Sequence, residues 1–221
     1  MAKITWKGSA LTAPIPPALV SCVGADGKPN VLTVAWTGIL CTHPPMTYIS
    51  VRPERYSYSL IRESGVFAVN LTSAALIHAA DFCGMRTGRK VDKFAACGLT
   101  PVYEEGFPCP LIEEAPLSLL CRVTQVIQLG SHDMFIASIE KVVVDEALLD
   151  KDGKLRLDRA ELAAFAHGEY FALGRKLGAF GFSVAKKKRR VNDAGKKPTR
   201  ARASDAKTEE STAKKPKSQK K

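Results

Sequence analysis

The chain has 221 residues, of which 45% are hydrophobic and 25% charged, a balance that excludes wholesale disorder. Its net charge of +11 is confined to one end, because residues 184–221 hold 15 Lys and Arg against 4 Asp and Glu, whereas residues 1–183 hold 18 of each. We therefore predict one neutral globular domain, residues 1–184, followed by a Lys/Arg-rich tail, residues 185–221, too charged and too poor in large apolar groups to pack.

The first half of the domain has the pattern of β-strands joined by short links. Residues 18–24 and 31–36 are apolar and β-branched, and Asp26-Gly27 supplies turn chemistry between them, so these segments predict a hairpin. Further strands are expected at 46–52 and 66–71. Two longer strands, 117–129 and 133–145, are predicted in the second half, with the mixed polarity of strands in a barrel wall.

Short helices are predicted between these strands, each followed by a glycine. They cover residues 55–65, 73–83 and 92–97, with Gly65, Gly84 and Gly98 as the stop signals. The strands and helices do not alternate regularly, which argues against a doubly wound parallel sheet. The sequence instead favours a mainly β fold, an antiparallel barrel with a few peripheral helices.

Several classes of protein and site are excluded by what the sequence lacks. The longest uncharged stretch, residues 29–51, contains Asn30 and the pair Pro44-Pro45, so no membrane span is expected. The N-terminus has no apolar secretory signal. Six scattered cysteines without zinc spacing predict reduced, mostly buried thiols, no metal site and a cytoplasmic location. They are Cys22, Cys41, Cys83, Cys97, Cys109 and Cys121.

Known nucleotide-binding and hydrolytic motifs are also missing. There is no phosphate loop, no G-x-G-x-x-G after a strand and no G-x-S-x-G elbow, and the four histidines do not cluster. Any chemistry is therefore expected to come from a bound cofactor and not from a protein nucleophile.

Two segments are candidate anion sites. The run from Arg55 through Ser57 and Tyr58 opens a predicted helix, where backbone N–H groups, a serine hydroxyl and an arginine suit a phosphate. The alternative is an ordinary serine cap beside a surface arginine. The basic loop containing Arg89 and Lys93 is a second candidate, and its alternative is a solvated loop.

Three further segments have a ligand interpretation and a structural one. Thr33, Ala35 and Thr37, with the following Cys41-Thr42 segment, suit a flat ring with polar edges, but threonine is also common in half-buried strands. Asn70 suits a ligand contact or the start of a turn. His167, in a segment predicted to be a short aromatic strand, suits catalysis or a structural role.

Taken in order, these segments resemble one family. The series ALVSCVG, PNVLTVAW, THPP, MTYISV, RYSYSLI and GVFAVNL is similar to the flavin reductase-like proteins with an FMN-binding split barrel, which include the flavoredoxins. TGRKVDKF and the later GEYFALGRKLGAFGFSV match the same family further along the chain. The resemblance covers residues 10–184 and implies a six-stranded antiparallel split β-barrel that forms a homodimer with FMN near the subunit interface.

The resemblance also implies where the flavin contacts lie. The phosphate is expected near Arg55, Ser57 and Tyr58, and the ring against the strand carrying Thr33, Ala35 and Thr37. The remaining implied cofactor contacts are Cys41, Thr42, Asn70, Arg89 and Lys93, and His167 is the implied catalytic residue, reaching the ring or a nicotinamide.

The sequence is compatible with two functions. The first is an enzyme that transfers hydride from NADH or NADPH to FMN, with FAD a less expected flavin, and from there to an acceptor. The second is an FMN electron carrier of the flavoredoxin kind, reduced by a protein partner. The pyridoxamine-phosphate-oxidase-like branch of split barrels also holds FMN, but its basic cluster for a substrate phosphate is not found here.

Two features are left with alternatives. The lysines and arginines of residues 186–221 suit sequence-indifferent contact with nucleic acid or another polyanion, or a solvated tail that aids solubility. Cys41 and Cys83 are candidates for redox activity, although buried thiols that only pack are commoner.

Overall fold

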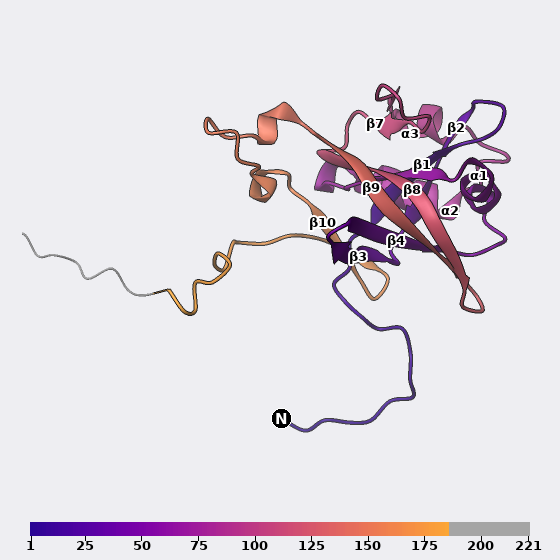
Figure 1. The fold of residues 1–221 in the computed structure, drawn as a ribbon. Coiled ribbons are helices and arrows are strands. Elements are labelled where there is room, and N and C mark those ends of the chain that lie inside the picture. Colours follow the sequence, from indigo (N-terminus) through magenta and orange to yellow (C-terminus); the bar gives the residue numbers. More distant parts are fainter. Residues whose placement is uncertain (186–221) are drawn as a thin grey trace, which may run out of the picture. The chain divides into compact units, whose positions relative to one another are not determined.

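A computed structural model describes residues 1–185 of the chain, and a seven-stranded sheet dominates it (Figure 1). The strand order is β2-β1-β5-β8-β9-β4-β3, and every neighbouring pair is antiparallel. The strands are β1 (Ala18–Val23), β2 (Pro29–Val34), β3 (Thr37–Thr42), β4 (Pro45–Val51), β5 (Val66–Asn70), β8 (Leu117–Gln128) and β9 (Asp133–Val144). The prediction of a mainly β, antiparallel fold is confirmed.

Small elements complete the fold. Two short sheets pair β6 (Pro101–Val102) with β7 (Leu111–Ile112), and β10 (Ala163–Ala166) with β11 (Glu169–Ala172). The helices are α1 (Tyr56–Ser64), α2 (Ile77–Met85) and α3 (Lys93–Cys97), with 3-10 turns η1 (Ala74–Leu76), η2 (Glu146–Leu148) and η3 (Leu157–Arg159). Among the described residues, no helix has the length and apolar character needed to cross a membrane.

The sheet closes on itself through a very short link. β2 and β3 are its two outermost strands, yet only Ala35 and Trp36 separate them along the chain. Ser50 N, on β4, donates a hydrogen bond of 2.9 Å to Trp36 O in this link. A two-residue connection can join opposite edges only if the sheet curls until they meet, as in a barrel.

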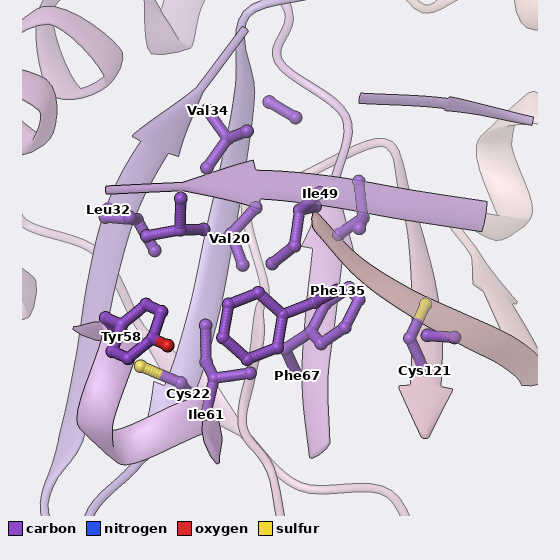
Figure 2. Close-up of a cluster of buried hydrophobic side chains, with 14 of the residues drawn as sticks. Val20, Cys22, Leu32, Val34, Ile49, Tyr58, Ile61, Phe67, Cys121 and Phe135 are labelled. Atoms are coloured by element: carbon purple, nitrogen blue, oxygen red, sulfur yellow. The ribbon is translucent and has the colours of Figure 1, made fainter. Parts of the chain in front are cut away.

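The barrel interior is filled by one apolar cluster (Figure 2). Six strands contribute buried side chains to it, β1, β2, β4, β5, β8 and β9, and α1 adds Tyr58, Leu60 and Ile61. Phe67 and Phe135 are its largest fully buried members. The seventh strand, β3, contributes none, and its Ile39 and Leu40 are exposed. The predicted six strands are therefore those that line the interior, and β3 is an additional edge strand.

The outer face of β1 and β2 is covered by the helices that later form one wall of the candidate site. Alternation along these strands sends Val20 and Leu32 inward, and Leu19 and Val31 outward. The outward pair packs with α2 and α3, whose Cys83 and Phe94 belong to the same cluster. This packing fixes the α2–α3 loop beside the end of β2.

Local signals place most helix ends. α1 ends at Gly65 and α3 at Gly98, both in the left-handed region with φ of 68° and 63°, as predicted. The Asp92 carboxylate caps α3 by accepting from Ala95 N at 3.1 Å. The prediction that Gly84 ends α2 is wrong, because the helix continues through it to Met85.

Two more local predictions are corrected by the structure. The predicted strand 31–36 stops at Val34, because the chain leaves one sheet edge at Ala35 and starts the unpredicted β3 at the other. His167 does not lie in a strand; it occupies the tight turn between β10 and β11, with φ of 51°.

The chain divides into two units, the first of residues 1–177 and the second beginning at Gly178. The first contains all the strands and helices named above. In the second, residues 178–185 form a turn with hydrogen bonds from Phe182 N to Ala179 O and from Val184 N to Gly181 O. The predicted boundary at 184/185 stays a prediction, and the predicted disorder and polyanion contact of the tail lie outside the described residues.

Candidate functional site

Three adjoining cavities lie where the first turn of α1, the end of β2 and the loop after α2 meet. We call them the cationic pocket, about 290 Å³, the middle pocket, about 420 Å³, and the outer pocket, about 480 Å³. The cationic and middle pockets share Thr33 and Arg55, and the middle and outer pockets share Ala35, Trp36 and Ser50. The three therefore form one continuous groove, of a size that suits a cofactor.

The cationic pocket carries an excess of positive charge. Four basic residues, Arg52, Arg55, Arg86 and Lys93, line it against one acid, Glu54. Glu54 Oε1 lies 3.7 Å from Arg52 Nη1, and both side chains are largely exposed. The first turn of α1 also faces this pocket, and the N-terminus of a helix carries partial positive charge. The pocket is thus built to attract an anion.

Arg55 stands at the N-cap of α1 and is held by a second element. Its backbone is extended, with φ of −68° and ψ of 136°, and its side chain makes no capping hydrogen bond. Instead, Nη1 donates to Gly84 O of α2 at 2.9 Å. A guanidinium has five N–H donors, so this contact fixes its direction and leaves others to face the pocket.

Lys93 is the buried cation of the pocket, only 4% exposed. Its Nζ donates to Val31 O and to Cys83 O, each at 2.8 Å. Burial lowers the pKa of this amine from its ordinary value, and the positive charge of Arg55 lowers it further. An ammonium has three N–H donors, so one remains for an anion in the pocket.

The α2–α3 loop approaches the pocket so closely that it requires a glycine. A Cβ on Gly88 would collide with Asn30 Oδ1 and lie 2.9 Å from Tyr56 Cδ1. Asn30 itself is anchored, because its Nδ2 donates to Ser57 Oγ at 2.7 Å. The backbone around Gly88 therefore forms a wall against α1, and a phosphate fits such a wall of backbone and basic side chains.

The middle and outer pockets are lined by small and aromatic residues. Thr33 Oγ1 donates to Ala80 O, and Thr37 Oγ1 donates to Tyr48 O at 2.6 Å, so both hydroxyl protons are already used. The Trp36 indole meets the His132 ring edge-on, with centroids 6.4 Å apart. Partial burial and the Arg52 charge lower the pKa of His132, which favours the neutral imidazole. This part of the groove suits a flat ring.

Two of the predicted phosphate contacts do not line the groove with their side chains. Tyr58 points into the barrel interior (Figure 2), where its hydroxyl donates to Asp133 Oδ2 at 2.6 Å and accepts from Arg62 Nη1 at 3.0 Å. Arg89 stacks its guanidinium over the Tyr56 ring, 4.8 Å from the centroid, outside the cationic pocket. Arg55, Ser57 and Lys93 do line it.

Asn70 is fully buried in the sheet and engaged on all sides. Its Nδ2 donates to Leu19 O and Ser21 Oγ, both at 2.9 Å. Its Oδ1 accepts from Ile112 N at 3.1 Å and Ser118 Oγ at 2.7 Å. Asn70 thus joins β5, on which it lies, to β1, β7 and β8, and it does not border the groove.

The other predicted residues divide between the groove and places apart from it. Thr33, Ala35 and Thr37 line it, although Thr37 belongs to β3 and Thr33 to β2. Cys41 and Thr42, at the far end of β3, pair with Met46 and Pro45 and do not border these pockets. His167 lines an adjoining cavity of about 320 Å³, which shares Ala10, Thr12, Ile15 and Trp36 with the outer pocket.

Sequence reasoning missed Arg52, Arg86 and His132, which line the groove, and Asn30, which donates a hydrogen bond to the groove residue Ser57. Arg52 follows β4 directly, and a basic residue after a strand is one signal that was available. His132 comes from the β8–β9 turn, which is eighty residues from Arg52 along the chain, and no local pattern links them.

A scan against family models matches residues 11–173 to the flavin reductase like domain. The flavoredoxin of Desulfovibrio vulgaris (Miyazaki F) is a similar solved structure, with 33% identity, a TM-score of 0.78, and coverage of 83% of this chain and 100% of that one. A protein with a split barrel domain from Shewanella frigidimarina is similar in fold, with 23% identity, a TM-score of 0.69, and coverage of 76% and 86%.

Sequence relatives point the same way. The NADPH-flavin oxidoreductase of Streptomyces viridifaciens is 30% identical over 132 residues, which are 58% of this chain and 67% of that protein. A protein of Aeropyrum pernix is 34% identical over 130 residues, 58% of this chain. That match spans about half, 49%, of the Aeropyrum protein's length.

Proposed function

The chain belongs to the flavin reductase-like domain family, and from this premise we propose that it is an FMN-dependent oxidoreductase that takes reducing equivalents from NADH or NADPH. The observation that carries the proposal is the cationic pocket. It brings Arg55, Lys93 and the backbone around Gly88 to the first turn of α1, at one end of a groove with room for a flat ring.

The phosphate of FMN is assigned to the cationic pocket on chemical grounds. A dianion is stabilised by charge-assisted hydrogen bonds from guanidinium and ammonium groups and by the positive end of a helix. Arg55 is already oriented by its 2.9 Å bond to Gly84 O, so little side-chain freedom is lost on binding. Ser57 lies within the first turn and is held by Asn30.

The isoalloxazine ring is assigned to the middle pocket. Thr33 and Ala35 are small enough to leave space beside the barrel, and Trp36 offers an aromatic wall. Bound FMN supplies the hydride acceptor that the chain's own side chains lack. The residues around it orient the ring and exclude water, and no general acid is needed for that transfer.

The outer pocket is assigned to the nicotinamide or another acceptor. It continues from the middle pocket past Trp36 and His132, and the neutral His132 imidazole offers a hydrogen bond to an amide. His167 stays a predicted catalytic residue, in the cavity that adjoins the outer pocket. Its role depends on whether the bound substrate reaches past the indole.

The second candidate function is an FMN electron carrier reduced by a protein partner. The observation that favours it is the 33% identity to a flavoredoxin that this chain covers over its whole length. Anaerobic mixing of the FMN-loaded protein with NADH or NADPH separates the two functions. Rapid loss of the oxidised flavin absorption supports the enzyme. Reduction by a low-potential protein donor alone supports the carrier and overturns the enzyme.

We also propose that the protein is a homodimer, as the family resemblance implies. The edge strand β3 carries exposed Ile39 and Leu40, 64% and 45% accessible, an unusual pair to leave in water. Sedimentation of the wild type and of an Ile39→Lys variant tests this. A dimer that becomes a monomer in the variant supports the proposal, and a wild-type monomer overturns it.

Charge reversal at Arg55 tests the flavin site. Arg55→Glu removes charge-assisted hydrogen bonds worth about 1.5–3 kcal/mol each and adds repulsion, so FMN affinity should fall about 100-fold or more. Lys151→Glu makes the same charge change in an exposed turn and is the matched control. FMN affinity is measured by fluorescence titration. Equal affinity in both variants would show that the FMN phosphate does not bind in this pocket.

A further inference from the structure

Two cysteines of neighbouring helices face each other beside the cationic pocket. Cys83 Sγ on α2 and Cys97 Sγ at the end of α3 are 3.9 Å apart. Cys83 is 1% exposed and lines the pocket, whereas Cys97 is half-buried. A disulfide has its sulfurs about 2.05 Å apart, so a movement of about 2 Å would join them.

The local structure permits that movement. α3 has only five residues and ends at Gly98 in the left-handed region, so its last turn can shift without carrying a long helix with it. The remaining cysteines lie elsewhere. Cys22, Cys109 and Cys121 are fully buried, and Cys41 lies on β3. Among residues 1–185, Cys83 and Cys97 are the one pair of cysteines whose sulfurs are in contact.

The peptide at Cys83 holds the two cations assigned to the phosphate. Cys83 O accepts from Lys93 Nζ at 2.8 Å, and the next carbonyl, Gly84 O, accepts from Arg55 Nη1 at 2.9 Å. Lys93 is also the first residue of α3, the helix that carries Cys97. Any displacement of α2 against α3 at this point is therefore transmitted to both cations.

We propose that Cys83 and Cys97 form a reversible disulfide under peroxide and that this bond weakens anion binding in the cationic pocket. The first part stands on the thiol geometry alone. The second part rests on the proposed function, because the anion is taken to be the FMN phosphate.

The chemistry balances with hydrogen peroxide as the oxidant. The more exposed Cys97 thiolate attacks peroxide; an S–O bond forms, the O–O bond breaks, and hydroxide leaves as water after protonation. Cys83 then displaces the second hydroxide from Cys97, an S–S bond forms, and another water is released. The two thiols lose two electrons and two protons in all, and peroxide gains them. A dithiol reverses the step by exchange.

The order of attack follows from burial. Desolvation raises the pKa of Cys83 to about 12, so this thiol is poorly suited to be the first nucleophile. It is well placed to resolve the oxidised Cys97, since the two sulfurs are already in contact.

Mass spectrometry of the full-length protein tests the bond. After peroxide, trypsin should release peptide 63–86 joined to peptide 94–122, and fragmentation should place the link at Cys97 and not at Cys109 or Cys121. Cys97→Ser and Cys83→Ser should each abolish it, and the control Cys41→Ser should not. A link at another cysteine, a link between two chains, or intact thiols at peroxide levels that oxidise Cys41 would overturn the proposal.

FMN titration tests the coupling. We expect the oxidised wild type to bind FMN about tenfold more weakly than the reduced protein, and dithiothreitol to restore the affinity. Peroxide should leave the affinity of Cys97→Ser unchanged. Equal affinities of the oxidised and reduced wild type would overturn the coupling while the mapped bond stands. Failure of both forms to bind FMN would overturn the proposed function, again without touching the mapped bond.

Discussion

The rim of the cationic pocket and the buried interior of the domain both hold polar side chains that the sequence singled out as flavin contacts, but these side chains have different hydrogen-bond partners. At the rim, Arg55 is exposed and donates one hydrogen bond within the protein, from Nη1 to Gly84 O. In the interior, Asn70 makes hydrogen bonds with four residues, and the Tyr58 hydroxyl both donates and accepts.

The difference follows from the cost of burial. A buried donor or acceptor without a partner costs about 1–3 kcal/mol, so interior polar groups are satisfied within the protein. Groups at the rim face water in the absence of ligand and keep donors to exchange for it. Residue type and position in the sequence cannot separate these cases, because burial is decided by packing. Rim residues should therefore govern binding, and interior residues should govern stability.

Asn70→Ala should give the largest loss of stability. It leaves Leu19 O, Ile112 N and the hydroxyls of Ser21 and Ser118 without their buried partner. At about 1–3 kcal/mol for each unsatisfied group, we expect a loss of about 3 kcal/mol or more in the free energy of unfolding, measured by urea denaturation. If the free energy of unfolding fell by less than about 1 kcal/mol while FMN binding weakened, Asn70 would be a ligand contact and not a structural residue.

Tyr58→Phe separates the ring of this residue from its hydroxyl. The variant leaves the buried Asp133 carboxylate without the 2.6 Å bond, so stability should fall by about 1–3 kcal/mol. FMN affinity, measured on protein shown by circular dichroism to be folded, should stay within about twofold of the wild type. A tenfold weaker affinity would place the hydroxyl on the phosphate.

Alkaline pH should destabilise the interior through its thiols. Burial raises the pKa of Cys121 from 9.0 to about 12. The folded state then keeps a proton that the unfolded state loses above pH 9, so stability is constant below pH 9 and falls as the pH rises toward 12. Cys121→Ala should remove up to about 1.4 kcal/mol of this fall per pH unit. If the free energy of unfolding fell equally with pH in the two proteins between pH 9 and 11, the raised pKa of Cys121 would be contradicted.

Glu54→Gln should give the smallest effect, and one of opposite sign. Glu54 is the one acid lining the cationic pocket, and its pair with Arg52 is exposed. Exposed pairs contribute about 0.2–1 kcal/mol, so removing the carboxylate should tighten FMN binding by up to about fivefold, less so in high salt. Weaker binding in this variant would mean that Glu54 contacts the ligand itself.

The sequence was informative wherever a local interaction decides the structure. Asp26-Gly27 marked the β1–β2 turn, and Gly65 and Gly98 ended their helices, because only glycine adopts these left-handed positions at low cost. Gly84 misled because it lies within α2, which continues to Met85 and packs this position against Thr33 of β2, where a Cβ would make a contact of 3.4 Å with Thr33 Cβ. A glycine that ends a helix and one that fits against a strand look the same in sequence.

The site was predicted in part, for a similar reason. Arg55 and Ser57 belong to one helix start, a pattern that the sequence displays. Asn30, Gly88 and His132 are brought together with them by the pairing of distant strands and by the packing of α2 on β2. Such positions depend on long-range contacts, which a single sequence without its fold does not specify.

The short passage through Ala35 and Trp36 has a consequence for folding. These two residues link β2 and β3 covalently, although β2 and β3 are the two outermost strands of the hydrogen-bonded order. The sheet is thereby closed into a barrel. The pairings that complete the barrel join segments distant in sequence, β1 with β5, β5 with β8 and β4 with β9, so we expect these pairings to limit the rate of folding. A circular permutant opened between these two residues would keep every strand pairing of the sheet and lose only this covalent link, at a point where both residues line the candidate groove.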